Sequence, residues 1–187
     1  MLLGANDASL PISIHRQAVP LDQYTANLKA IITHPNITAH RPKILLVTPP
    51  PVDELTRVDY DVACGHGTLT HHARSVAKYA QAVREVAAAV DGTVLIDLWA
   101  AIQSRAEELT PGWVHQKDGP WLGTPESGTS GGFKKLLSDG LHLTSDGYKL
   151  FYSLVAPYIH PGVDLTDGMT WMYPHWRVVS AIPEKQE

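Results

Sequence analysis

The chain has a single cysteine, Cys64, among its 187 residues, so no disulfide can form within it. A lone thiol suits a reducing compartment. A bilayer-spanning helix needs about 18 apolar residues in a row, and no apolar run in the chain approaches that length. The N-terminus has neither the basic region nor the apolar core of a signal peptide. We therefore expect a cytoplasmic protein that does not act at a membrane.

The chain also has little charge. Charged residues make up 18% of it and the formal net charge is −4. A weakly acidic balance argues against nucleic acid or an anionic membrane as the main partner. Apolar residues at 44% indicate a globular protein, and this length is most simply one domain with a core of its own.

Short apolar runs alternate with amphipathic periods along most of the chain. Runs at 43–48 and 93–98 are typical of buried parallel strands, and residues 1–3 are typical of the end of a further strand. Helical spacing of apolar residues predicts helices at 21–34, 73–90, 100–109 and 145–158, the last of them capped by Ser145. Such alternation predicts a parallel sheet covered by helices.

Three segments lack a period. Residues 52–69 are polar and are interpreted as a surface insertion, and residues 110–132 are rich in glycine and proline and predict a long irregular loop. Long irregular loops in compact domains often border binding sites. The segment 160–187 carries aromatic residues without a period, so we expect a tail that packs them on the body.

The most informative local pattern is Asp139-Gly140-Leu141-His142-Leu143-Thr144. An Asp three residues before a His, with a Gly between them, lets one tight loop present a carboxylate and an imidazole together. In a nucleophilic hydrolase the carboxylate orients the ring and stabilises the imidazolium that forms when the ring takes a proton. The alternative is an Asp-Gly turn followed by a histidine with a purely structural role.

A second pattern, Gly4-Ala5-Asn6-Asp7, follows the apolar pair at residues 2–3. The two patterns together resemble the SGNH (GDSL-type) hydrolase superfamily. Longer strings are similar to its isoamyl acetate-hydrolysing esterase branch, in order from residue 3 to about residue 158: Leu3–Ala8, Val19-Pro20-Leu21, Thr48–Glu54 and Asp139–Thr144. Several matched strings in the right order are more specific than any one of them.

The resemblance implies a flavodoxin-like α/β fold of three layers, with a five-stranded parallel sheet in the order 2-1-3-4-5. This chain would supply strands three to five in a domain at 1–160, followed by the tail at 161–187. The implied activity is hydrolysis of small carboxylic esters by acyl transfer to water, with no metal and no cofactor. His142 would be the general base and Asp139 its orienter.

The same resemblance assigns roles to the N-terminal loop. Asn6 would donate to the oxyanion, Gly4 would permit close approach of the main chain, and Asp7 would orient the loop. For Asn6 the alternative is a loop-capping residue, because Asn-Asp pairs are good turn formers.

The family's nucleophile is the Ser of a Gly-Asp-Ser block that precedes the Gly-x-Asn-Asp block, here beginning at residue 4. We therefore expect an N-terminally incomplete fold without its own nucleophile, inactive as written and prone to self-association or homo-oligomer formation through an exposed sheet edge. The alternative is a non-catalytic isoform or pseudoenzyme that acts as a binding or regulatory protein. The serines near the two loops, none of which stands in a Gly-x-Ser-x-Gly elbow, are Ser9, Ser13, Ser138 and Ser145.

The sequence has only a weak signal for a metal site and none for a nucleotide site. Cys64-x-His66 followed by His71-His72 invites a zinc interpretation, but the spacing matches no standard structural set, and a solvated insertion is the simpler interpretation. No Gly-rich phosphate loop follows a strand, so we expect no nucleotide cofactor.

Overall fold

The computed structural model describes residues 1–12, 17–115 and 119–159. The chain divides into two compact units, Met1–Leu154 and Val155–Glu187. Of the second unit the structure describes a short 3-10 helix, η1, Ala156–Tyr158. The predicted tail at 161–187 lies outside the described residues.

The sheet of the first unit is built on two parallel strands, β1 (Ile44–Val47) and β2 (Thr93–Ile96), with Ile44 opposite Thr93 and Val47 opposite Ile96. On the other edge of β1, Leu2 makes an isolated parallel bridge to Val47. The three predicted strand segments therefore lie side by side in the predicted order and direction, which confirms the parallel sheet. The N-terminal segment differs from the prediction in contributing one bridge rather than a strand.

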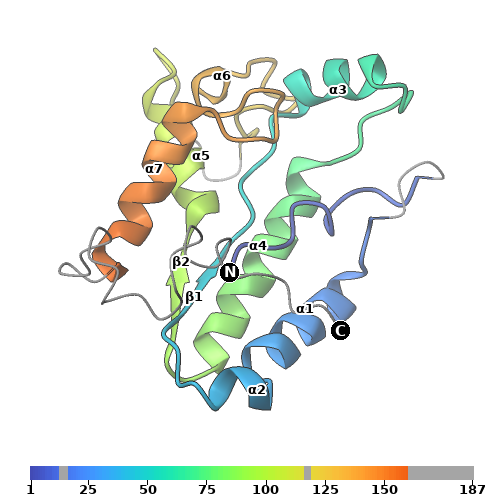
Figure 1. Ribbon diagram of the computed structural model, residues 1–187. Helices are drawn as coiled ribbons and strands as arrows, with labels where there is room; N and C mark the ends of the chain where they lie inside the picture. The colour runs from blue at the N-terminus through green and yellow to red at the C-terminus, as the bar shows by residue number, and fades with distance from the viewer. Residues whose placement is uncertain (13–16, 116–118, 160–187) are drawn as a thin grey trace, which may run out of the picture. The chain divides into compact units, whose positions relative to one another are not determined.

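Seven α-helices surround these strands in the described part of the first unit: α1 (Leu21–Ile32), α2 (Pro35–Thr38), α3 (Glu54–Ala63), α4 (Ala73–Ala89), α5 (Leu98–Glu108), α6 (Phe133–Leu136) and α7 (Ser145–Val155). In Figure 1, α1 and α4 lie on one side of the strand pair, and α5 and α7 lie on the other. Helices on both faces of a parallel sheet make the predicted three-layer α/β/α architecture.

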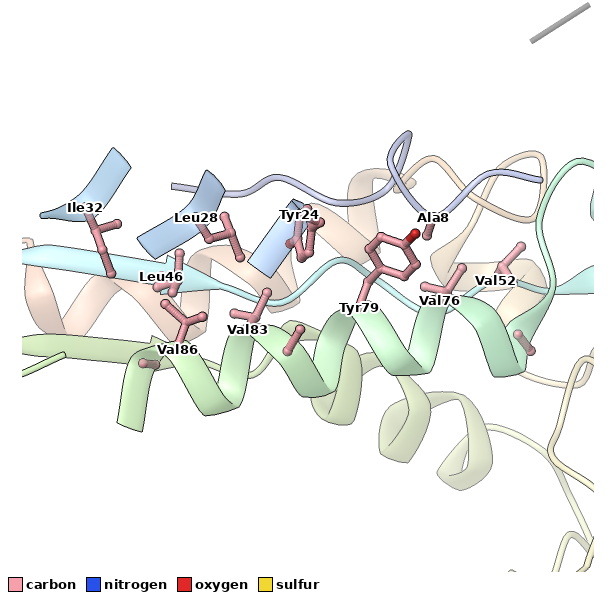
Figure 2. Packing of buried hydrophobic residues seen from close by; sticks show 13 residues of the cluster. Ala8, Tyr24, Leu28, Ile32, Leu46, Val52, Val76, Tyr79, Val83 and Val86 are labelled. Carbon is pink, nitrogen blue, oxygen red and sulfur yellow. The ribbon is translucent and has the colours of Figure 1, made fainter. Parts of the chain in front are cut away.

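The main apolar core lies between α1, α4 and β1 (Figure 2). Tyr24, Leu28 and Ile32 are spaced four residues apart, so they share one face of α1. That face packs on α4 and on Leu46 of β1, which is almost fully buried. The same period that predicted these helices from sequence therefore builds their interface.

One prediction was wrong: the segment 52–69 is not a solvated insertion. It contains α3, whose buried residues are all polar: Glu54, Arg57 and Asp61. They recur at intervals of three and four, which is the helical period, but a search for apolar periodicity does not detect charged residues. Glu54 attaches this polar helix to α4, because its carboxylate accepts the N–H of Ala73 (2.7 Å) at the start of α4.

The predicted loop at 110–132 is irregular in its described residues, but its second half is not a free surface loop. Leu122 is 1% exposed, and Ser130 is buried with its hydroxyl 3.0 Å from Oδ1 of Asp53. The carbonyl of Gly123 accepts the N–H of Glu54 at 2.8 Å. This half of the loop therefore packs against the start of α3.

The last predicted helix is present, but its details differ. The N–H of Gly147 donates to the hydroxyl of Thr144 at 3.2 Å, so Thr144 rather than Ser145 caps α7. Tyr148 and Tyr152, which were predicted to lie on the apolar face, are exposed. Gly147 lies on the buried face instead, and a Cβ there would clash with the carbonyl oxygen of Leu136.

Candidate active site

The loop from Asp139 to His142 presents its two functional side chains in contact. Nδ1 of His142 lies 2.7 Å from Oδ2 of Asp139. Gly140 allows the tight turn, with φ at +83°. An isolated antiparallel bridge between Leu137 and Leu143 joins the two ends of the loop. We call residues 139–142 the base loop.

Asp139 is held as a carboxylate. Its Oδ1 accepts the main-chain N–H groups of Leu141 (3.0 Å) and His142 (2.8 Å). Burial by itself would raise the pKa of Asp139, but hydrogen bonds from the main chain and ring of His142 and from Leu141 outweigh it, so the pKa lies below its usual value. An ionised Asp139 therefore orients the ring of His142.

The imidazole of His142 is exposed on its other side. The side chain is 71% exposed, whereas Asp139 is 9% exposed. Because Nδ1 is directed to the carboxylate, Nε2 is the nitrogen that remains for a reacting group. Nε2 makes no hydrogen bond to any described residue.

The base loop is packed against the start of α3. The N–H of Asp53 donates to the carbonyl of Gly140 at 2.9 Å. A Cβ on Gly140 would lie 2.6 Å from the carbonyl oxygen of Asp53 and 2.7 Å from the main-chain nitrogen of Arg57. Only glycine fits there, so the base loop and α3 have a fixed separation.

The N-terminal motif forms a second loop, residues 4–9, which we call the Asn6 loop. It turns through hydrogen bonds from Ala8 N–H to the Gly4 carbonyl (3.0 Å) and from Ser9 N–H to the Asn6 carbonyl (3.1 Å). Gly4 has φ at +109°, and a Cβ there would lie 2.5 Å from the Tyr24 hydroxyl. Tyr24 donates to the carbonyl of Leu3 at 3.1 Å, which explains its close approach.

Asp7 contributes to this loop through its main chain. Its carbonyl accepts the N–H of Val19 at 3.1 Å, and the carbonyl of Val19 accepts the hydroxyl of Tyr79 on α4 at 2.6 Å. Burial, followed by the negative charge of Asp7, raises the pKa of Tyr79. The tyrosine therefore remains a neutral donor that joins the Asn6 loop to α4.

Asn6 and His142 line the same hollow, of about 220 Å³. Residues of α3 and the turn after it complete its wall, among them Tyr60 and Cys64. A hydrogen bond with Cys64 is the main cause that raises the pKa of Tyr60. The structure thus brings an amide from one end of the sequence and an imidazole from the other to one small, polar hollow.

The candidate serines do not complete a triad in the described part of the chain. Ser9, the last residue of the Asn6 loop, is buried, and its hydroxyl has no hydrogen-bond partner among the described residues. The hydroxyl of Ser138 donates to the main-chain carbonyl of His142 at 3.1 Å and not to its ring. Ser145 is exposed in the first turn of α7, and Ser13 lies outside the described residues.

Two histidines of the possible zinc motif, His71 and His72, have other contacts. Nε2 of His71 lies 2.9 Å from the carbonyl oxygen of Ala5, and Nδ1 of His72 lies 3.2 Å from Oε2 of Glu54. Among the residues that the structure describes, no group of three or more His, Cys, Asp or Glu side chains is arranged to hold a metal ion.

The sequence patterns did not indicate that four residues connect the base loop to the Asn6 loop through hydrogen bonds and ion pairs: Arg57, Asp61, Thr70 and His71. Nη1 of Arg57 donates to Oδ2 of Asp139 at 2.9 Å, inside the site itself. The available signal was the helical spacing of Arg57 and Asp61 in a segment of otherwise polar character.

The sequence profile of the GDSL-like Lipase/Acylhydrolase family matches residues 1–150. The chain belongs to this family. The match includes both the Asn6 loop and the base loop, so the hollow between them lies within the part of the chain that defines membership.

Curated relatives agree with this family. The isoamyl acetate-hydrolyzing esterase 1 homolog of Mus musculus is 30% identical over 186 residues, which are 98% of this chain and 63% of the relative. The human homolog is 28% identical with the same coverage. A GDSL esterase/lipase of Arabidopsis thaliana is 29% identical over 94% of this chain and 64% of its own length. The chain therefore spans less than two thirds of these relatives.

A solved structure from Streptococcus pneumonia, named for platelet activating factor, shares the fold. The TM-score is 0.55 at 21% sequence identity, over 85% of this chain and 57% of that one. The three-layer architecture is thus common to both chains. As for membranes, none of the helices in the described ranges is both long enough and apolar enough to cross a bilayer.

Proposed function

We propose that this chain carries the base side and an oxyanion donor of a carboxylic ester hydrolase that acts on small esters. The observation that supports it is the hollow that Asn6 lines together with His142, whose ring is in contact with the carboxylate of Asp139. Family membership and the names of the esterase relatives favour the same reaction class.

The proposed mechanism follows from the two loops. Nε2 of His142 takes the proton of a nucleophilic hydroxyl as it attacks the ester carbonyl, and returns that proton to the departing alcohol. Asp139 stabilises the imidazolium in between. The side-chain amide of Asn6 donates to the oxyanion, and removal of one such donor costs about 3–4 kcal/mol of transition-state stabilisation in comparable hydrolases. Water then releases the acid by the same steps.

The nucleophilic hydroxyl is the missing component of this proposal. No described serine contacts the ring of His142. We therefore propose that the 187-residue chain alone turns over esters poorly, because losing the nucleophile of a triad costs on the order of a million-fold in kcat. This same observation favours the second candidate function, a binding or regulatory protein that keeps the hollow without catalysis.

The test compares the 187-residue chain with a form extended at its N-terminus by a Gly-Asp-Ser segment of the family. Both are assayed with a short-chain p-nitrophenyl ester and with a fluorophosphonate probe that labels activated serines. We expect labelling and turnover in the extended form alone, with both lost on His142→Ala.

The matched control is His115→Ala, because His115 also pairs with a carboxylate, 3.3 Å from Oε1 of Glu107, but outside the site. It should leave turnover unchanged. Turnover by the short form that depends on His142 would mean that one of its own serines is the nucleophile. An extended form that folds and binds ester but has no activity would support the non-catalytic function.

A further inference from the structure

The carboxylate of the base loop is held from behind by α3. Nη1 of Arg57 donates to Oδ2 of Asp139 at 2.9 Å, the same oxygen that lies 2.7 Å from Nδ1 of His142. Arg57 is buried, and a guanidinium does not lose its proton in proteins. Asp139 therefore lies between a fixed cation and the imidazole, and its orientation depends on both.

The same guanidinium extends the contact away from the site. Nη2 of Arg57 lies 2.8 Å from Oδ1 of Asp61, one turn later on α3. Asp61 is fully buried, and its Oδ2 accepts the main-chain N–H (2.7 Å) and the hydroxyl (2.6 Å) of Thr70. These partners offset the cost of burying the charge. They also connect α3 to the segment that leads into α4.

The series of contacts ends at the Asn6 loop. The hydroxyl of Thr70 lies 2.8 Å from Nδ1 of His71, and Nε2 of His71 lies 2.9 Å from the carbonyl oxygen of Ala5. A carbonyl oxygen only accepts, so Nε2 carries a proton and donates it. The carbonyl of Ala5 and the N–H of Asn6 belong to one planar peptide unit, so this hydrogen bond also orients the main-chain N–H of Asn6.

Stability alone does not explain so many buried polar groups. Replacing a buried ion pair by apolar residues of similar volume is often neutral or even stabilising. The paired members of a buried polar network do, however, hold one another in one arrangement. In this network Nε of Arg57 has no hydrogen-bond partner among the described residues, and Oδ1 of Asp61 is paired only through its ion pair with Nη2 of Arg57. Here the members span the whole distance between the two loops of the site.

We propose that Arg57, Asp61, Thr70 and His71, which we call the polar bridge, are positioning residues that couple the base loop to the Asn6 loop as one unit. This inference rests on the proposed function, because it assigns to the two loops the roles of base and oxyanion donor. Disturbing the middle of the polar bridge loosens both loops at once, although neither loop itself is changed.

Amide hydrogen exchange on the 187-residue chain tests this coupling without any turnover. The amides of Leu141 and His142, bonded to Asp139, report on the base loop, and those of Ala8 and Ser9 report on the Asn6 loop. Thr70→Val removes the central hydroxyl at constant size. We expect exchange to accelerate at both pairs of amides, relative to amides inside α4, which correct for global unfolding.

The matched control is Thr48→Val. Thr48 is equally buried, and its hydroxyl also makes two hydrogen bonds, to Asp97 (3.3 Å) and from the N–H of Trp99 (2.8 Å), away from the site. It should leave all four reporter amides unchanged relative to α4. Acceleration of the Asn6 loop alone in Thr70→Val would show that the loops are independent, and the proposal would be overturned.

A second readout follows charge rather than rigidity. In Arg57→Met the cation beside Asp139 is lost, so the carboxylate acts undiminished on His142, and the midpoint of the ring's NMR titration moves to higher pH. Arg57→Lys restores the charge and should bring the midpoint back. Arg84→Met, which removes an Arg–Asp97 pair outside the site, should not move it.

An unchanged midpoint in Arg57→Met would overturn the role of Arg57. These measurements need only the folded chain, so an absence of esterase activity in the N-terminally extended form would contradict the proposed function and leave the polar bridge standing. Conversely, independent loops in an active enzyme would contradict only the polar bridge.

Discussion

At the scale of single residues, Gly140 occupies a position where no other residue fits without strain. It combines a positive φ with main-chain neighbours where a Cβ would lie. Gly65 is a matched position, with φ at +84° and nothing within 4 Å of its Cβ site. The pair separates the cost of the backbone conformation from the cost of the close approach.

We expect Gly140→Ala to lower the free energy of unfolding by about 3 kcal/mol or more, and Gly65→Ala by about 1 kcal/mol. The difference arises because the new methyl group would displace the start of α3 from the base loop. Urea unfolding followed by circular dichroism measures both. Equal losses in the two variants would mean that α3 yields easily, and that the base loop does not depend on it.

Asp139 predicts a pH dependence of stability. Its pKa is lower in the folded chain than in the unfolded one, so the folded state favours the ionised form. The stabilisation is fully present above the unfolded value of about 3.9 and is lost as pH falls through the lowered folded value. The stability difference between wild type and Asp139→Asn should therefore be large at pH 6 and shrink below about pH 4.

Thermal unfolding across this pH range checks the expectation. Asp91→Asn is the control, because Asp91 is exposed and its side chain has no hydrogen-bond or ion-pair partner among the described residues. A difference between wild type and Asp139→Asn that stays constant from pH 6 to pH 3 would show that the charge of Asp139 does not stabilise the fold.

Sequence reasoning found the residues of the two loops but not the residues between them. His142, Asp139 and Asn6 stand in short motifs, so their neighbours in sequence reveal them. Arg57 and His71 contact these loops across 82 and 66 residues of chain, and nothing local marks those contacts. Pairings of this kind depend on the packing of α3, which a pattern of local spacing does not contain.

At the scale of elements, the apolar period was a reliable guide where helices face the core. It predicted α1, α4 and α5 because their buried faces are apolar. It failed for α3, whose buried face is charged, and it misplaced two tyrosines on α7. A helix with a charged buried face, such as α3, is therefore not detected by a search for apolar periodicity.

The packing of residues 119–132, the second half of the irregular loop, predicts how substitutions in this loop change stability. Leu122 is fully enclosed, whereas Val114, earlier in the same loop, is 74% exposed. We expect Leu122→Ala to cost about 2–5 kcal/mol and Val114→Ala to cost less than 1 kcal/mol. The physical reason is that only the first change leaves a buried cavity.

Urea unfolding measures this difference, and an ester series of increasing acyl length shows whether the extended form changes its preference. A small stability loss with a changed preference for Leu122→Ala would restore the interpretation of this segment as a substrate-binding loop. A large stability loss with an unchanged acyl-length preference would show that residues 119–132 have a structural role in supporting the base loop.

At the scale of the whole molecule, the alternation of strands and helices predicted a parallel sheet, whereas the order of its strands was implied only by the family resemblance. The N-terminal segment lies at the far edge of β1, where the carbonyl of Met1 accepts the N–H of Val47 at 2.9 Å. Alternate groups of a strand face opposite neighbours. The main-chain groups of Leu2 therefore face away from β1.

This edge also exposes apolar side chains, since Leu2 is 39% and Leu3 is 43% exposed. An unpaired apolar edge is a template for pairing with another chain. We expect the 187-residue chain to self-associate with increasing concentration, and Leu2→Lys to reduce this association by placing a charge at the edge. Sedimentation velocity over a range of concentrations measures both.

The control for this last prediction is Val62→Lys, because Val62 is also an exposed apolar residue but lies on α3, away from the sheet edge. If association runs through the edge, Val62→Lys should associate as wild type does, and the N-terminally extended form should also associate less, because added chain can pair with Leu2. A chain that stays monomeric at all concentrations would contradict the prediction. Equal effects of the two lysine variants would show that net charge, and not the edge, controls association.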